Sequence, residues 1–323
     1  MVSVITLTYK NFDGLFRTIT SVLEQDWPEF EYIISDDGSG NFPKQEVIDF
    51  VEQNRKDNLK RFEVFDNKIN VGTVKHLNNA IRWCEGEYIF DLSCNDLFVD
   101  EHTISRIIQA FDEEQCDVLF ISRMDYKNGR VCAICPHYHD RKRIHKLDTK
   151  EKRLSAFMLT EHCDMFIGPN VIYKKSVIER NGYFDENYVL FEDAPMIAKM
   201  IINEKVSIRP DLFYVLYDCA TGVSAPRSRN PILSNDINRY NSIGKMEYYD
   251  QVDNRARYHI RFGVERVNAK NTLQLMLVCI KYLPRIVGYS FYSLGRKISG
   301  VGDRCVIKKL HSPYFDERGI LCK

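Results

Sequence analysis

The sequence lacks several features that would place it in common protein classes. Neither charge sign is in excess: 45 Lys and Arg stand against 45 Asp and Glu, so no net field draws the chain to nucleic acid. The N-terminus, MVSVITLTYKN, has no basic segment followed by an apolar one, so no signal peptide is expected. No uninterrupted apolar run reaches the ~20 residues of a membrane span. These absences predict a cytoplasmic protein without nucleic-acid partners.

The ten cysteines show no disulfide framework, because they are scattered through a long chain and several lie in apolar segments. We therefore expect reduced thiols. One local cluster, in VCAICPHYHD, has the composition of a compact zinc site: Cys132, Cys135, His137 and His139. It follows the turn-forming pair Asn128-Gly129, which is typical of a β-hairpin. A single CxxC without a distant second pair favours the hairpin over the metal site.

The composition is that of a folded globular protein. Apolar residues make up 44% of the 323 positions and charged residues 28%, which excludes disordered and collagen-like chains. A chain of this length buries a sizeable core and holds one large domain or two ordinary ones.

The first 122 residues alternate between strand and helix patterns. Apolar or β-branched runs predict strands at 2–8, 31–35, 61–65, 87–92 and 117–122. Between them, apolar residues at helical spacing predict helices over about 15–23, 47–51, 74–84 and 104–111, with Asn11 or Asp13 capping the first. Repeated βα units predict a mostly parallel sheet covered by helices on both faces.

The later segments follow a different pattern. Residues 123–165 are predicted to form a hairpin and an insertion, 193–204 a helix, and 206–218 two short strands. The polar stretch 220–231 is predicted to be a loop and a domain boundary. The tail beyond 230 mixes leucines, tyrosines and basic residues, with Pro284 inside its most apolar part. It fits either amphipathic helices on a membrane surface or a helical subdomain packed on the core.

Ligands of open parallel sheets bind beyond the carboxyl ends of the strands, so strand-terminal side chains are candidate site residues. The first strand is not followed by GxGxxG, and GxxxxGK[ST] does not occur, which disfavours two common modes of phosphate binding. Asp96 follows the strand at 87–92. A divalent cation that bridges its carboxylate and phosphate oxygens would reconcile their negative charges.

Five segments together resemble a known family. They are VSVITLTYKN, ISDDGSG, INVGTVKHLNNAI, GEYIFDLSCND and FDENYVLFEDAPMIAKM. Their order and spacing over about residues 1–220 resemble inverting glycosyltransferase family 2, which has the GT-A fold. The resemblance implies an α/β (Rossmann-like), mostly parallel sheet in a domain at 1–220, with a nucleotide-sugar half at 1–122 and an acceptor half at 123–220. Residues 221–323 would then form a loop and a C-terminal helical extension.

The resemblance also implies roles for donor-site residues. Thr8, Tyr9 and Asp37 would hold the nucleotide base and ribose, and Asp36 would support that turn. Because Asp37 resembles the carboxylate that accepts from uracil, a UDP-sugar is the favoured donor. Lys75 would face the diphosphate, although a solvated surface lysine is the commoner case.

Asn95-Asp96 stands where the family places its DXD-type acidic pair. The resemblance implies that Asp96 binds Mn²⁺ or Mg²⁺ and that Asn95 bonds a ribose or sugar hydroxyl. The chain departs from the family pattern here, because Ser93 and Asn95 occupy positions that are often aspartate. Asp96 is left as the single acid, which puts the metal preference in doubt.

The pair Glu192-Asp193 matches the ED motif of the family, in which the aspartate is the general base of the inverting reaction. A helix N-cap is the alternative role for Asp193. Gly168-Pro169-Asn170 resembles the turn under the donor sugar, so Asn170 would contact a sugar hydroxyl. His162 and Asp164 are interpreted as structural. The loop 221–224, with Arg227 and Arg229, is interpreted as a closing lid or a linker.

These observations predict a metal-dependent hexosyl- or N-acetylhexosaminyltransferase that uses a saccharide or lipid-linked saccharide acceptor. Such enzymes resemble those that build capsule, O-antigen or exopolysaccharide, and a peripheral position at the inner face of the membrane would follow. Two alternatives remain open. One is a non-catalytic nucleotide-sugar or glycan binding protein, suggested by Ser93 and Asn95. The other is a sugar-phosphate nucleotidylyltransferase, disfavoured because TLTYKN replaces its glycine- and arginine-rich signature.

Overall fold

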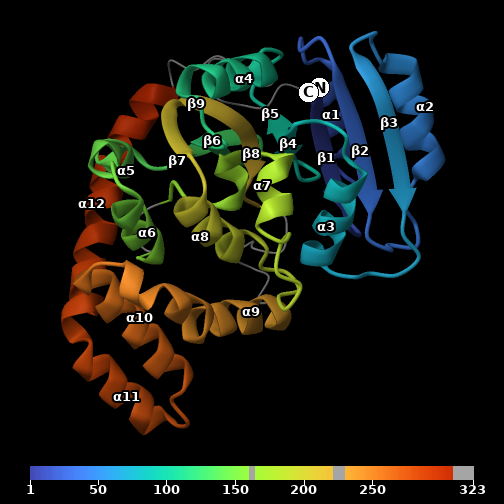
Figure 1. Ribbon diagram of the computed structural model, residues 1–323. Helices are drawn as coiled ribbons and strands as arrows, with labels where there is room; N and C mark the ends of the chain where they lie inside the picture. Colours follow the sequence, from blue (N-terminus) through green and yellow to red (C-terminus); the bar gives the residue numbers. More distant parts are fainter. Residues whose placement is uncertain (160–163, 221–229, 308–323) are drawn as a thin grey trace.

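A mixed nine-stranded sheet is the centre of the described part of the chain (Figure 1). The computed structural model describes residues 1–159, 164–220 and 230–307. The strands are β1 (Val2–Thr8), β2 (Phe30–Asp36), β3 (Leu59–Asp66), β4 (Tyr88–Asp91), β5 (Leu97–Phe98), β6 (Val118–Lys127), β7 (Arg130–Cys135), β8 (Val171–Lys174) and β9 (Val206–Asp218). The α-helices are α1 (Leu15–Leu23), α2 (Lys44–Asn54), α3 (Thr73–Trp83), α4 (Thr103–Glu114), α5 (Tyr138–Arg141), α6 (Lys150–Met158), α7 (Lys175–Arg180), α8 (Asp193–Asn203), α9 (Pro231–Ser242), α10 (Asn254–Val267), α11 (Thr272–Lys281) and α12 (Leu283–Ile307). Short 3₁₀ turns are η1 (Ile144–Lys146), η3 (Gly168–Asn170) and η4 (Gly244–Gln251).

The first half of the sheet is parallel, in the order β3-β2-β1-β4. Strand β2 is buried at every position and β1 at all but one, because helices cover both faces. The strands are in register at their carboxyl ends, where Thr8 pairs with Asp36 and Asp36 pairs with Asp66. Polar residues that follow these strands therefore meet at one edge of the sheet.

The second half of the sheet is mixed, in the order β4-β8-β6-β9-β5. Strand β8 lies antiparallel between β4 and β6, whereas β9 is parallel to β6. The predicted hairpin is formed by β6 and β7, with Asn128 and Gly129 at positive φ in the turn. The prediction of two strands at 206–218 was wrong: β9 is one strand, and its pairing with β6 skips from Arg209 to Phe213 around Pro210.

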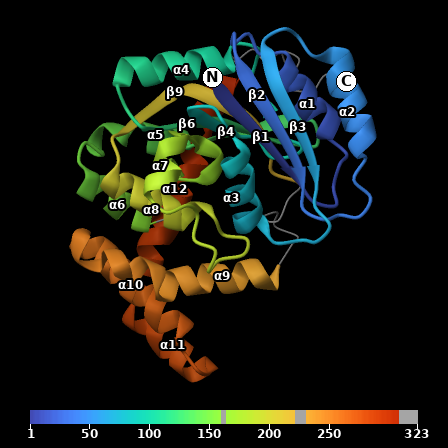
Figure 2. The same ribbon diagram turned by 45° about the vertical axis from the view of Figure 1, so that its right-hand side comes forward.

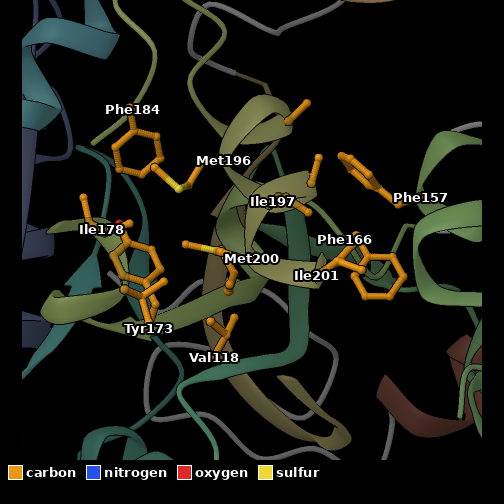
Figure 3. Packing of buried hydrophobic residues seen from close by; sticks show 14 of the residues in the cluster. Val118, Phe157, Phe166, Tyr173, Ile178, Phe184, Met196, Ile197, Met200 and Ile201 are labelled. Atoms are coloured by element: carbon orange, nitrogen blue, oxygen red, sulfur yellow. The ribbon is translucent and has the colours of Figure 1, made fainter. Parts of the chain in front are cut away.

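Helix α8 fills the space beside the central strands, where its apolar face joins a large buried cluster (Figure 3). This face was predicted from the apolar spacing of DAPMIAKMIINE. Labelled members of the cluster are Val118, Phe157, Phe166, Tyr173, Ile178, Phe184, Met196, Ile197, Met200 and Ile201. Because α8 begins at Asp193, its packing fixes where that carboxylate lies.

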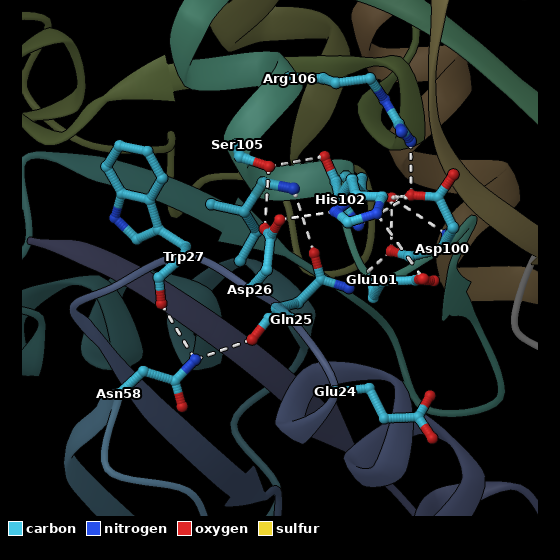
Figure 4. A network of polar contacts seen from close by, with 12 residues as sticks. Glu24, Gln25, Asp26, Trp27, Asn58, Asp100, Glu101, His102, Ser105 and Arg106 are labelled. Atoms are coloured by element: carbon cyan, nitrogen blue, oxygen red, sulfur yellow. Dashed lines mark hydrogen bonds and ion pairs between the residues drawn. The ribbon is translucent and has the colours of Figure 1, made fainter.

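A polar network lies at the edge of the sheet away from the carboxyl ends of the parallel strands, just before the amino ends of β2 and β3 (Figure 4). The carboxylate of Asp26 accepts from Ser105 and lies 2.6 Å from Nδ1 of His102. The amide of Asn58 donates to the backbone oxygens of Gln25 and Trp27. These contacts join three loops, so this edge is structural and the carboxyl edge is left for ligands.

The helices beyond residue 230 pack on the sheet domain to different degrees. Tyr240 of α9 and Ala256 and Ile260 of α10 belong to the same buried cluster as α8, as the subdomain interpretation predicted. Helix α11, in contrast, has no buried residue. Across the described ranges, none of the helices is both long enough and apolar enough to cross a bilayer.

Candidate active site

The turn after β2 is fixed by the carboxylate of Asp36, which is fully buried. Its Oδ1 accepts from the hydroxyls of Thr8 (2.9 Å) and Ser39 (2.6 Å), and its Oδ2 accepts from the backbone N–H of Ser39. The ends of β1 and β2 are thereby locked together. This arrangement agrees with a supporting role for Asp36.

Asp37 connects this turn to the loop after β3. Its two carboxylate oxygens accept from the backbone N–H groups of Val71 and Gly72, each at 3.0 Å. Gly38, at φ +77°, has no room for a side chain, because a Cβ atom there would lie 2.5 Å from the carbonyl carbon of Ile69. The family resemblance implied only a contact between Asp37 and uracil, and the structure shows that Asp37 also shapes the loop at 69–72.

Asp96 lies in the turn between β4 and β5 and not directly at the end of β4. Its backbone oxygen accepts from Thr18 of α1, and its Oδ1 accepts from the backbone N–H of Asp218 at the end of β9 (2.8 Å). Burial raises the pKa of Asp96 well above its usual range. The side chain is therefore fixed in place before any ligand binds.

Arg123, which sequence reasoning missed, acts electrostatically on both Asp96 and Asp193. Its Nε donates to Asp125 (2.7 Å), and its guanidinium lies over the ring of Tyr217, 4.0 Å from the centroid. Burial raises the pKa of both Asp96 and Asp193, and the positive charge of Arg123 opposes that rise at each. The positive charge of Arg123 thus acts on two carboxylates that come from distant parts of the sequence.

Asp193 is oriented by backbone donors. Its Oδ2 accepts from the N–H of Gly168 in η3 (3.1 Å), and its Oδ1 accepts from the N–H of Ala194 (2.7 Å). The alternative role as an N-cap does not apply, because α8 starts at Asp193 and its N-cap position is Glu192, without a side-chain cap. The matched turn Gly168-Pro169-Asn170 therefore does contact the candidate base.

A small cavity of about 30 Å³ lies among three carboxyl groups: Asp91, Glu192 and Asp193. Its other walls include Gly168 and Tyr173. Burial raises the pKa of all three carboxyl groups, that of Asp91 to about 7, and the charge of Asp193 adds to the rise at Glu192. Side chains of this kind exchange protons near neutral pH, as a general base requires.

The raised pKa of Asp91 predicts how the stability of the fold depends on pH. Between its ordinary value of 3.8 and about 7, folded protein holds a proton that unfolded protein has released, so stability falls as pH rises through this range. Asp91→Asn removes the ionisable group. We expect the melting temperature of Asp91→Asn, measured relative to wild type, to be higher at pH 8 than at pH 5.

Asp211→Asn provides a control of opposite sign. Arg209 lowers the pKa of Asp211, so that carboxylate stabilises the fold above its ordinary pKa and loses this effect in acid. The melting temperature of Asp211→Asn, relative to wild type, should be lower at pH 8 than in acid. An equal difference between Asp91→Asn and wild type at pH 5 and pH 8 would contradict the assignment for Asp91.

The surroundings of Asp96 fit a divalent cation whose remaining ligands come from a substrate. No group of three or more His, Cys, Asp or Glu side chains in the described ranges could hold a metal ion. Asp96 has one carboxylate oxygen bonded to Asp218, and the other forms no hydrogen bond within those ranges. Mg²⁺ is commonly bound by one or two carboxylates together with substrate phosphates. A single acid is therefore sufficient only if a diphosphate binds beside it.

The other residues predicted to bind the nucleotide-sugar differ in how exposed they are. Tyr9 is 43% exposed and Lys75 is exposed on α3, so both are accessible. The side chain of Asn95 lies against Gly14, since a Cβ atom on that glycine would come within 2.1 Å of Asn95 Oδ1. The roles of Tyr9, Lys75 and Asn95 remain predictions.

The sugar contact predicted for Asn170 does not fit this conformation. Asn170 is fully buried, and its amide donates to the backbone oxygen of Cys135 (3.1 Å). Its Oδ1 is buried without a hydrogen-bond partner among the described residues. In this conformation the side chain links η3 to the end of β7.

Asp236 of α9, also missed by sequence reasoning, supports the segment before the candidate base. Its buried Oδ2 accepts from the backbone N–H groups of Val189 and Leu190, each at 2.8 Å. Tyr240, one helical turn later, donates to the backbone oxygen of Ala194 (3.3 Å). The C-terminal extension thus helps to position Asp193.

The Cys/His cluster does not converge. Cys132 lies 3.8 Å from Cys219, whereas Cys135 contacts the backbone oxygen of Asp164. His137 lies beside Asp164 and Asp303. The remaining predictions, for His162, for the loop at 221–224 and for Arg227 and Arg229, lie outside the described residues.

Comparisons with known proteins bear on the family and the fold of the chain. The model of the family described as glycosyl transferase family 2 matches residues 3–182, more than half of the chain. The chain is 26% identical over 225 residues to the bifunctional glycosyltransferase pgtA of Dictyostelium discoideum, covering 63% of this chain but 29% of that protein. It is also 26% identical over 263 residues to the poly(ribitol-phosphate) β-N-acetylglucosaminyltransferase TarP of Staphylococcus aureus strain N315, covering 79% of this chain and 75% of that protein.

Among solved structures, that of S. aureus TarS 1–349 with UDP-GlcNAc superposes with a TM-score of 0.54 at 18% identity, covering 91% of this chain and 88% of that one. This similarity confirms the predicted fold class.

Proposed function

The chain belongs to glycosyl transferase family 2, and on this basis we propose that it moves a sugar from a UDP-sugar to a hydroxyl group of a saccharide acceptor, with inversion. The observation that carries the proposal is the carboxylate of Asp193, which the backbone N–H groups of Gly168 and Ala194 hold at the wall of a cavity shared with Asp91 and Glu192. A direct displacement needs a charged leaving group on one side and a base on the other. Asp193 would supply the base, and Asp96 would hold the cation that stabilises the leaving diphosphate.

The proposed donor site lies along the carboxyl edge of the parallel half of the sheet. Asp37 and the loop at 69–72 would hold the base, and Thr8 and Asp36 would support the turn that binds the ribose. The exposed ring of Tyr9 is available to stack on the base. The fixed hydrogen bonds of Asp36 and Asp37 support this proposal, because a preformed site spends less binding energy on ordering.

The proposed base is Asp193, assisted by Glu192. Asp193 accepts the proton of the acceptor hydroxyl while that oxygen bonds to the anomeric carbon. The bond from this carbon to the diphosphate oxygen breaks, and UDP leaves with its electron pair. The two backbone donors at Gly168 and Ala194 orient the carboxylate, and burial raises its pKa toward the range in which a base works best.

A divalent cation, Mn²⁺ or Mg²⁺, is proposed at Asp96. When bound there, it would neutralise the charge that develops on the departing diphosphate. Asp96 itself is held by the Asp218 N–H, so its free oxygen keeps a constant direction toward the donor site.

For the transferred sugar we propose N-acetylhexosamine first and hexose second. TarP is named for β-N-acetylglucosaminyl transfer, and the TarS structure contains UDP-GlcNAc. The proposed acceptor is a saccharide hydroxyl on a lipid-linked oligosaccharide of capsule, O-antigen or exopolysaccharide synthesis, at the cytoplasmic face of a membrane.

Calorimetric titration of UDP into the purified protein tests the donor site. With Mn²⁺ present we expect binding that weakens at least about tenfold in EDTA, because the cation bridges carboxylate and phosphate. GDP is the matched control and should bind more weakly. Transfer from UDP-GlcNAc to saccharide acceptors, measured as UDP release, follows.

The outcomes separate the alternatives. UDP binding without turnover of any UDP-sugar would favour the non-catalytic binding protein. Activity with UTP and a sugar phosphate would favour a nucleotidylyltransferase. Failure of UDP to bind in either condition would overturn the proposed donor site.

A further inference from the structure

Helix α12 is attached to the rest of the protein by its polar side. Tyr292 donates to both carboxylate oxygens of Asp140 (2.8 and 2.7 Å), and Arg296 pairs with Asp164. Asp303 accepts from the guanidinium of Arg141 (2.8 Å) and from the backbone N–H of residue 138. These contacts hold α12 along α5 and β7, at the outer edge of the molecule (Figure 1).

The opposite side of α12 carries a continuous apolar stripe. The stripe residues follow one another at intervals of three or four, which places them on one helical face. They are Leu283, Val287, Phe291, Leu294 and Ile298, with exposed fractions from 45% at Val287 to 70% at Phe291. Amphipathic helices of globular proteins bury the apolar face and expose the polar one. Helix α12 does the reverse.

Helix α11 extends the same surface. It has no buried residue, although most of its side chains are apolar, as in a helix of a protein core. Four of them repeat the spacing of the stripe: Leu273, Met276, Leu277 and Ile280, all of them exposed. Figures 1 and 2 both place α11 at the lower end of the molecule, away from the sheet. Both helices therefore leave apolar side chains uncovered, and exposed apolar faces of this kind mark interaction sites.

Charge indicates what covers this surface. Residues 254–307 contain ten Lys and Arg but only two acidic residues, Glu265 and Asp303, although the whole chain is neutral. On α12, the exposed side chains of Lys297 and Arg304 lie seven positions apart and so flank the stripe on one side. Basic residues beside an apolar helical face are the composition of helices that lie in the interface of an anionic bilayer.

We propose that α11 and α12 bind the surface of a membrane that contains anionic lipid, with the apolar stripe inserted among the acyl chains and the flanking cations at the headgroups. A second copy of the chain fits less well, because it would bring two basic segments together. The proposal is independent of the transfer reaction, since vesicle binding is measured without any sugar donor.

The test is sedimentation of the full-length protein with vesicles of phosphatidylglycerol and phosphatidylcholine in equal parts. We expect binding that weakens at least about tenfold on pure phosphatidylcholine. The variant Phe291→Ser with Ile298→Ser should bind the mixed vesicles at least about tenfold more weakly, because it removes the two most exposed side chains of the stripe.

The matched control is Ile232→Ser with Ile243→Ser, two exposed isoleucines outside α11 and α12. It should bind like wild type, and unchanged circular dichroism should confirm that both variants fold. Equal loss of binding in the control, or no binding of wild type to the mixed vesicles, would overturn the proposal. So would a concentration-dependent dimer in lipid-free solution that the stripe variant abolishes.

Discussion

Replacing the proposed base by its uncharged isostere, Asp193→Asn, is expected to lower kcat for sugar transfer by about 10²- to 10⁴-fold, the usual contribution of a general base. The amide oxygen can still accept from Gly168 or Ala194, so the turn at η3 should persist. The affinity for UDP should therefore stay within about twofold, because the change removes a proton acceptor and no donor contact. UDP release under saturating donor and titration calorimetry measure these two quantities.

Asp250→Asn is a suitable control, because the same exchange at an exposed position should leave both quantities unchanged. The pH profile adds a second criterion. Burial raises the pKa of Asp193, so the wild-type rate should fall as pH is lowered through that raised value. Full transfer activity in Asp193→Asn would exclude this residue as the base.

The parallel half of the sheet was predictable because its strands and helices have clear and different periodicities. Strands β1 to β4 and helices α1, α3 and α4 lie within a few residues of their predicted bounds. Where the prediction failed, local chemistry decided the outcome. The caps expected at Asn11 or Asp13 do not form, because the Asn11 amide oxygen accepts from the backbone N–H of Asp13 and α1 begins after Gly14.

The errors in the second half have a similar origin. Helix α6 was not predicted, since it is short and rich in charge and buries little besides Leu154, Phe157 and Met158. Two short strands were predicted at 206–218. The structure keeps one strand, because the skip in register places Pro210 where it needs no ladder donor and lets its oxygen accept from Ser122.

Only some residues of the candidate site could be predicted from the sequence. Strand-end position identified Asp36, Asp37 and Asp96, and the same rule applied to β9 would have identified Asp218. Asp236 gave no local signal, since its partners at Val189 and Leu190 lie almost fifty positions earlier. Contacts of this kind depend on the packing of α9 and not on any pattern within it.

The two halves of the site are joined through backbone contacts. Asp37 holds the loop at Gly72, where a Cβ atom would meet Val189 at 2.6 Å, and Val189 is in turn held by Asp236. A donor that orders the loop at 69–72 would therefore also brace the segment that leads to Asp193. The expected consequence is that donor binding and base placement are coupled.

The second large effect is expected at Asp96. In Asp96→Asn, the amide oxygen can still accept from the Asp218 N–H, so the turn keeps its shape while the negative charge is lost. Mn²⁺ should no longer strengthen UDP binding, whereas affinity in EDTA should be close to that of wild type, because EDTA removes the cation from both proteins. Loss of even an outer-shell partner typically costs a metal site about 10- to 100-fold in affinity, so losing the single protein carboxylate should cost at least as much.

Asp91→Asn separates this role from a general effect of charge. It also removes a carboxyl group that acts on Asp96, but this group lines the cavity beside Glu192 and Asp193 and is not a proposed ligand of the cation. Mn²⁺ should therefore still strengthen UDP binding to Asp91→Asn. Equal stimulation by Mn²⁺ in Asp96→Asn and wild type would show that the cation, if one takes part, is held elsewhere. Arg123, whose positive charge acts on both carboxyl groups, would then be the candidate to neutralise the charge on the leaving diphosphate, and substitution of that arginine would become the decisive experiment.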